Sequence, residues 1–248
     1  MKKTLLALSL AAVAAQASAL TAGDIAVIAV NSDGDDNFAW VALTDIAAGT
    51  VINFTDSSYQ GTAFRSTEHL DAGGPLTWSY GSTLAAGTVI TYSGAVTNTW
   101  SLGAAGGTGL SLSTSGDQIF AFEGSASSPS FVYGLQFANA AGIVDAPTVS
   151  NSTNTTNVPG GLSVAGGTML NVGNYDDSFY QGVTTGTQAQ LLAAIADVNN
   201  WYRSDSANEP TQWASSFTVA AVPEPETYGM LLSGLALLAG VARRRNKA

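Results

Sequence analysis

The sequence predicts a mainly β protein: a single antiparallel β-sandwich with one α-helix late in the chain. Three observations favour this fold. Short runs rich in Val, Ile, Phe, Trp and Tyr recur through the middle of the chain, and Gly, Asn, Asp and Ser separate them. Several runs alternate apolar and polar residues, as in a sheet with one packed face and one wet face. A single stretch near the end of this region has helical spacing instead.

The alternation is clearest in residues 51–55, where Ile52 and Phe54 share one face because successive side chains of a strand point to opposite sides. Ala-Ala-Gly-Thr precedes two of the predicted strands, at residues 47–50 and 85–88. Since the sequence between the copies does not match, we interpret them as a recurring glycine turn and not as a repeat architecture. The predicted strands cover residues 24–30, 37–43, 51–55, 76–80, 88–92, 118–122, 131–137 and 217–219.

The predicted helix covers residues 187–200 and packs on the sheet or over one open end of it. Its apolar stripe consists of Leu191, Leu192, Ile195 and Val198. Two segments are typical of surface loops: residues 103–109, which are rich in Gly and Ala, and residues 150–161, which are rich in Ser, Thr and Asn.

Both ends of the chain are typical of processing signals, which we separate from the folded domain. Lys2 and Lys3 precede an apolar run over residues 5–15, and Ala17 and Ala19 stand at the two positions that signal peptidase reads. The run is too short for a membrane anchor, which needs roughly 20 apolar residues. The predicted organisation is a helical signal peptide at residues 1–19, a β-sandwich domain at residues 20–220 and a tail with a helical segment at residues 221–248.

The predicted domain is strongly acidic and contains no cysteine. Between residues 20 and 222 there are 13 Asp and 3 Glu against two basic side chains, Arg65 and Arg203, which gives a formal charge of −14. Nucleic-acid binding is excluded because it needs clustered Lys and Arg. Disulfides, thiol catalysis and cysteine-ligated metals are excluded as well. Core burial, or a bound cation, must therefore supply the stability of the domain.

The C-terminal tail has three parts: Pro-Glu-Pro, an apolar run and an arginine cluster. They are formed by Pro223, Glu224 and Pro225, by residues 228–241, and by Arg243, Arg244 and Arg245. The prolines break regular structure and leave an extended segment that a protease can reach. The apolar run is barely long enough to span a bilayer, and the arginines would hold its end in the cytoplasm.

This three-part tail resembles the PEP-CTERM sorting domain of Gram-negative bacteria. In that family an exosortase recognises Pro-Glu-Pro, removes the membrane tail and releases the protein to the cell surface or the exopolysaccharide matrix. The resemblance implies signal peptidase and exosortase as partners during export, and membrane contact only through the tail before processing. The alternative is an ordinary C-terminal anchor, which would not need Pro-Glu-Pro at that place.

The middle of the chain resembles an uncharacterised domain of secreted bacterial proteins, and its layout is similar to lamin-tail-like β-sandwiches. The segments that carry this resemblance are residues 23–26, 36–41, 52–56 and 116–122 and the pair Asn200-Trp201. It implies a β-sandwich fold and carries over no catalytic residue.

One acidic cluster, at residues 31–37, supports a calcium hypothesis. Calcium takes six to eight oxygen ligands, and closely spaced Asp and Asn side chains in a turn supply several. The candidate ligands are Asn31, Asp33, Asp35 and Asp36. The helix-loop-helix calcium pattern does not fit, because its glycine falls in the wrong place and Ala42 stands where the closing Glu should be. The alternative is a turn between two strands that binds no metal.

Other candidate residues give weaker signals. Asp176 and Asp177 are neighbours, which would point to opposite sides of an extended chain, so we expect a solvated turn and not an acid/base pair. Three glutamates could serve a glycosidase, although the sequence alone places no two of them at a working distance: Glu68, Glu123 and Glu209. The single histidine, His69, has no Gly-x-Ser-x-Gly motif to partner it, so a loop or surface position is expected.

Aromatic residues are the last candidates, either as a sugar-stacking platform or as ordinary core, and core is the commoner role. They are Trp40, Trp78, Trp100, Trp201, Trp213, Tyr59, Tyr80 and Tyr92. Taken together, the sequence predicts a non-enzymatic exported protein of the cell surface or exopolysaccharide matrix, with no required cofactor. Two alternatives stay open: a secreted carbohydrate-active hydrolase that uses two carboxylates, and a calcium-stabilised adhesion module.

Overall fold

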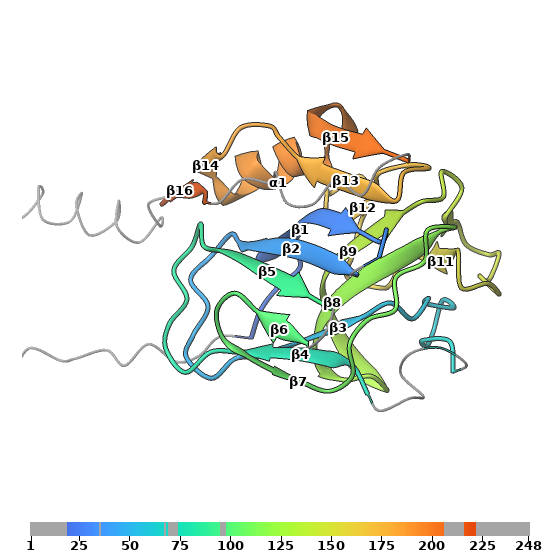
Figure 1. Ribbon diagram of the computed structural model, residues 1–248, viewed down its shortest axis with the longest axis horizontal. Helices are drawn as coiled ribbons and strands as arrows, with labels where there is room; N and C mark the ends of the chain where they lie inside the picture. Colours follow the sequence, from blue (N-terminus) through green and yellow to red (C-terminus); the bar gives the residue numbers. More distant parts are fainter. Residues whose placement is uncertain are drawn as a thin grey trace, which may run out of the picture.

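The computed structural model describes residues 19–34, 36–66, 68, 74–94, 98–205 and 216–221 (Figure 1). The predicted signal segment up to Ser18 and the tail beyond Ala221, with the helices expected in them, lie outside the described residues. Across the described ranges, no helix is both long enough and apolar enough to cross a membrane.

The first of two large sheets has six strands in the spatial order β15-β13-β1-β2-β5-β6, and each neighbouring pair in it is antiparallel. Its strands are β1 (Ile25–Asn31), β2 (Asn37–Ala42), β5 (Val89–Ser93), β6 (Thr99–Trp100), β13 (Asp177–Tyr180) and β15 (Trp201–Ser204). The long strands near its centre, β1 and β2, are almost wholly buried, as expected for strands with packed neighbours on both sides.

The second large sheet also has six strands, in the order β12-β9-β8-β3-β4-β7. Its strands are β3 (Val51–Thr55), β4 (Leu76–Ser79), β7 (Ala104–Gly106), β8 (Asp117–Ser125), β9 (Ser128–Phe137) and β12 (Met169–Asn171). Two short pairs complete the strands: β10 (Ile143–Val144) with β11 (Thr156–Asn157), and β14 (Thr185–Thr187) with β16 (Thr218–Ala220).

The prediction of a mainly β sandwich with one α-helix is confirmed, and each of the eight predicted strands overlaps an observed one. Three short pairings are parallel, however: β12 with β9, β10 with β11, and β14 with β16. Parallel neighbours need long crossover connections, which here are residues 138–168, 145–155 and 188–217.

Aromatic side chains join the two sheets face to face. Trp40 of β2 contacts Trp78 of β4 edge-on, with ring centroids 5.0 Å apart, and Phe38 of β2 meets Phe54 of β3 at 5.3 Å. A second, smaller core lies on the other side of the second sheet, because Phe120 and Phe122 of β8 point away from the first core. Alternation along β8 therefore buries both faces of this sheet.

The helix, α1 (Gln188–Ala196), begins at a capping box in which Thr187 and Gln190 bond each other's backbone amides. Leu191 and Ile195 are buried, while Leu192 and Val198 of the predicted stripe are partly buried against the same core. A short 3-10 helix, η2 (Val198–Asn200), follows and leads into β15.

The two predicted surface loops are partly wrong. Residues 104–106 form β7, an exposed edge strand on β4, and Gly107 (φ +72°) passes so close to Pro75 that a Cβ there would overlap its carbonyl oxygen. Within residues 150–161, Asn157 is buried and its Nδ2 donates to the carbonyl oxygens of Val144 and Thr148, each at 2.8 Å. Polar side chains thus bond the backbone of neighbouring loops, which a loop-like composition does not reveal.

The recurring Ala-Ala-Gly-Thr segments are glycine turns, as predicted. Gly49 has φ +81° and Gly87 has φ +88°, a left-handed backbone that glycine adopts without a Cβ penalty. At Gly87 the backbone also approaches Phe217 closely, and the Phe217 amide donates to the Gly87 carbonyl at 2.9 Å.

Candidate functional site

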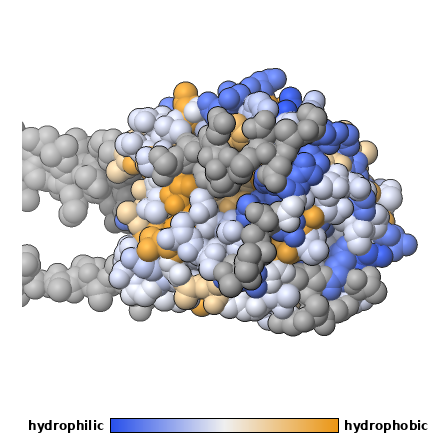
Figure 2. Space-filling view, viewed as in Figure 1, coloured by the Kyte–Doolittle hydropathy of each residue, from blue (hydrophilic) through white to orange (hydrophobic). Residues whose placement is uncertain are grey.

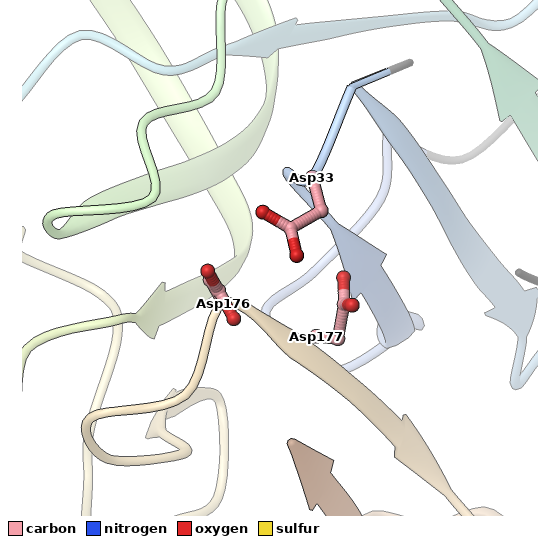
Figure 3. A group of neighbouring side chains, drawn as sticks. All are labelled: Asp33, Asp176 and Asp177. Carbon is pink, nitrogen blue, oxygen red and sulfur yellow. The ribbon is translucent and has the colours of Figure 1, made fainter. Parts of the chain in front are cut away.

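Three carboxylates meet where β1 ends and β13 begins (Figure 3). Asp33 lies in the turn after β1, and Asp176 and Asp177 stand at the start of β13. Because β1 and β13 are antiparallel neighbours, the end of one lies beside the start of the other, with Asn31 opposite Asp177. One carboxylate oxygen from each aspartate lies within 4.8 Å of the others. We call this group the strand-end cluster.

The strand-end cluster is largely buried. Asp176 is 6% exposed and Asp177 is 1% exposed, while Asp33 is half-buried. Burial raises the pKa of Asp176, and the neighbouring carboxylates of Asp33 and Asp205 add to that rise. One oxygen of Asp176, Oδ1, is fully buried and has no hydrogen-bond partner.

The backbone around the cluster is held firmly. The amide and the hydroxyl of Ser32 both donate to the Asp176 carbonyl at 3.2 Å, which ties the turn after β1 to β13. The nearby guanidinium of Arg203 lies over the Tyr175 ring, 4.9 Å from its centroid, and donates to the Val172 carbonyl at 3.3 Å.

Of the three aspartates that the sequence suggested as calcium ligands, the structure places one, Asp33, beside the Asp176-Asp177 pair. Asp33 joins Asp176 and Asp177, Asp36 stands elsewhere in the turn with a left-handed backbone (φ +48°), and Asp35 lies outside the described residues. The prediction that Asp176 and Asp177 form a solvated turn is wrong. Alternation applies inside a strand, and β13 begins only at Asp177, so the two side chains are free to converge.

A second group of carboxylates lines a surface cavity of about 310 Å³. Asp56, Glu68 and Asp117 contribute the acidic groups, and Thr108, Ser111 and Thr153 are among its other lining residues. We call this group the cavity cluster. Glu68 was a candidate from the sequence, but Asp56 and Asp117 were not. Asp56 follows β3 and Asp117 begins β8, so the pairing of these two strands brings them together.

Backbone amides donate hydrogen bonds to all three carboxylates of the cavity cluster. Asp56 Oδ2 accepts from the Ser111 amide at 2.7 Å, and Glu68 Oε2 accepts from the Ser58 amide at 2.6 Å. Asp117 accepts from two amides, through Oδ2 from Ser113 at 2.9 Å and through Oδ1 from Gln118 at 2.8 Å.

Buried Gln118 connects the cavity cluster internally. Its Nε2 donates to Asp117 Oδ1 at 2.9 Å, to the Asp56 carbonyl and to the Thr153 carbonyl at 3.3 Å. Burial raises the pKa of Asp117 well above its usual range, and the charge of Asp56 raises it further. Burial also raises the pKa of Glu68, against the lowering effect of the Ser58 amide and Arg65. The cavity therefore holds carboxyl groups that tend to keep their protons.

The remaining candidates do not gather at either cluster. Glu123 lies apart, where its Oε2 accepts from the Leu20 amide at 2.7 Å. His69, Glu209 and Trp213, together with the predicted sorting residues, lie outside the described residues, and so does Ala17.

The aromatic residues are core. Trp40, Trp78, Trp100, Trp201 and Tyr92 are all less than a tenth exposed, which confirms the core interpretation for them, while Tyr59 and Tyr80 are half-buried. In the part of the chain that the structure describes, the large hydrophobic side chains that are exposed are aliphatic. Hydrophobic residues form separate small patches on the face in Figure 2. The four tryptophans among the described residues are therefore part of the core and not of a sugar-stacking surface.

The fold and its two carboxylate clusters define an acidic β-sandwich protein. The C-terminal end identifies its class of export. Residues 221–246 match the family model described as the PEP-CTERM protein-sorting motif. The chain thus carries a PEP-CTERM sorting motif, which implies an exported protein that is sorted at the cell envelope and processed by exosortase.

No curated protein and no solved structure matches the chain. The resemblance of the middle to a secreted bacterial domain, and to lamin-tail-like sandwiches, therefore stays a prediction.

Proposed function

We propose that this protein is a non-enzymatic component of the cell surface or exopolysaccharide matrix of a Gram-negative bacterium. The observation that carries the proposal is the PEP-CTERM motif at residues 221–246. The signal-like N-terminus and the acidic, cysteine-free domain support it, because such a domain suits an extracellular protein and avoids anionic membranes.

The start of the folded domain supports signal cleavage between Ala19 and Leu20. Leu20 is buried, and its backbone nitrogen lies 2.7 Å from Glu123 Oε2. Cleavage at that bond would turn this amide into an α-ammonium group beside a carboxylate. The mature N-terminus would then be held by a charge-assisted hydrogen bond.

The partner class follows from the charge of the domain. With 16 acidic and two basic side chains, its surface repels a polyanion, so a neutral exopolysaccharide is the polymer it would contact. Polar side chains on the loops would make that contact, since the aromatic rings described above are taken up in the core.

The test is the intact mass and cell fraction of the protein from its native host. We expect a mass that lacks residues 1–19 and the tail after Pro-Glu-Pro, found in the medium or matrix. Glu224→Gln should leave the protein uncut in the inner membrane, while Glu226→Gln, the same change just outside the triplet, should be processed normally. An uncut wild-type tail in the inner membrane would show that the protein is simply anchored.

A second function, hydrolysis of a glycan by two carboxylates, is favoured by the cavity cluster. Asp117, whose pKa is raised, would act as general acid, and Asp56 in the same cavity as the partner carboxylate. Release of reducing ends from the host's exopolysaccharide, lost in Asp117→Asn and kept in the exposed control Asp145→Asn, would support this activity. Binding of the polymer without turnover would favour the non-enzymatic function.

A further inference from the structure

We propose that Asp33, Asp176 and Asp177 bind one calcium ion, which links the turn after β1 to the start of β13. This metal site differs from the one that the sequence suggested, since two of its three ligands come from a distant part of the chain. It also goes beyond sorting and export, which involve only the two ends of the chain.

The spacing of the three carboxylates fits one calcium ion. Calcium binds oxygen at 2.3–2.6 Å, so two oxygens on opposite sides of the ion are about 4.8 Å apart. The candidate oxygens of the three aspartates all lie within 4.8 Å of one another. Figure 3 shows the carboxylates converging from two separate strand ends on the space between them.

An unpartnered oxygen points independently to a ligand. The Asp176 residue is only 6% exposed, and its Oδ1 has no hydrogen-bond partner. A carboxylate oxygen removed from water without a hydrogen-bond donor disfavours the charged form of the group. Binding to a cation would offset that effect directly.

The local charge balance points the same way. Asp205 adds a fourth negative charge close to Asp176. Arg203 is one of only two basic side chains between residues 20 and 222, and its guanidinium is engaged with the Tyr175 ring and the Val172 carbonyl. A divalent ion would neutralise most of the charge that the three aspartates carry.

The donor chemistry selects calcium among the common metals. All three ligands are carboxylate oxygens, and the chain has no cysteine and a single histidine, so zinc and copper lack their preferred donors. Asp33 is only half-buried, which leaves one side of the ion open to water. Calcium accepts such irregular, partly hydrated oxygen shells more readily than magnesium does.

The test is calorimetric titration of CaCl2 into EGTA-stripped exported protein, together with thermal melting. We expect one binding event per chain, with Kd about 0.1–1 mM, as in extracellular calcium modules. Calcium at 5 mM should raise Tm by about 3–8 °C, while 5 mM MgCl2 should raise it less.

Asp176→Asn provides the decisive comparison because its effect should change sign with the metal. In EGTA the variant should melt at or above the wild-type temperature, since it removes one of several like charges. In 5 mM CaCl2 it should melt below the wild type. A purely structural hydrogen-bonding role for Asp176 would lower Tm in both conditions.

Two further variants keep the proposal testable. Asp33→Asn changes a half-buried turn residue and should weaken calcium binding about tenfold or more, even if Asp176→Asn does not fold. Asp145→Asn removes the same charge from an exposed site and should bind calcium as the wild type does. Absence of both heat and a Tm shift, equal shifts with magnesium, or unaltered binding in Asp33→Asn would each overturn the proposal.

Discussion

The strand-end cluster and the cavity cluster contain three carboxylates each, yet the protein treats them differently. In the cavity cluster, every carboxylate accepts a backbone amide at 2.6–2.9 Å, and Gln118 adds further donors. In the strand-end cluster, an oxygen of Asp176 is buried without a donor. Backbone amides and Gln118 stabilise the buried carboxylates of the cavity cluster, and a bound cation is the corresponding proposal for the strand-end cluster.

The largest effect that would test this comparison is expected from Gln118→Ala. The variant removes three hydrogen bonds from a fully buried side chain and leaves a cavity, so the free energy of unfolding should fall by about 3 kcal/mol. Urea unfolding would measure it, with the exposed Gln181→Ala as control. A loss below about 1 kcal/mol would mean that the cavity cluster does not depend on its internal donors.

The sequence predicted the strands of this network but not the network itself. Alternation in residues 51–55 and the apolar run at 118–122 were sufficient to predict β3 and β8, because burial of one or both faces leaves a local pattern. That these strands are neighbours depends on pairing between distant segments, which local pattern does not encode. For the same reason β13 was not predicted, because the Asp-Asp pair at its start is also typical of a solvated turn.

The candidate sites were predicted less completely than the fold. The acidic turn at residues 31–37 was a candidate calcium site because its oxygens are close in sequence, and Asp33 does belong to a carboxylate cluster. Its partners, Asp176 and Asp177, become neighbours only through the antiparallel pairing of β1 with β13. Burial of these carboxylates could not be predicted either, since acidic residues are usually exposed.

A pH titration would sharpen the comparison next. Because the folded pKa of Asp117 is raised above its usual 3.8, the folded protein holds a proton that the unfolded chain releases. The resulting stability is complete below about pH 3.8 and is lost as the pH rises through the folded pKa. Glu68 acts in the same direction.

In Asp117→Asn, the loss of stability that Asp117 causes as the pH rises should disappear. The slope of the unfolding free energy against pH should become less negative than in the wild type above pH 4, by at most about 1.4 kcal/mol per pH unit for one proton. Urea unfolding at several pH values would measure both slopes, with Asp145→Asn following the wild type. Parallel curves for Asp117→Asn and the wild type would show that Asp117 is ionised in the cavity.

Glu123 offers a third arrangement, in which processing of the chain would supply the cation. If cleavage makes Leu20 the N-terminus, Glu123→Gln should lower the unfolding free energy of the processed protein by about 1 kcal/mol. The difference should shrink above about pH 9, where an α-ammonium group loses its proton. Asp45→Asn, which removes the charge from the acceptor of the uncharged Ala86 amide, should show no such pH dependence. A pH-independent effect in Glu123→Gln would argue that Leu20 is not the N-terminus.

The smallest effect is expected from Arg65→Gln, which removes the ion pair between Arg65 and Glu68 (3.5 Å). The Arg65 side chain is 25% exposed, so water and salt screen the pair and its loss should cost about 0.5 kcal/mol. Urea unfolding in low and high salt would measure it, and the cost should nearly vanish in high salt. A loss above about 2 kcal/mol would mean that the cavity cluster also depends on a cation. A small loss would show that the cavity cluster keeps its stability without the charge of Arg65.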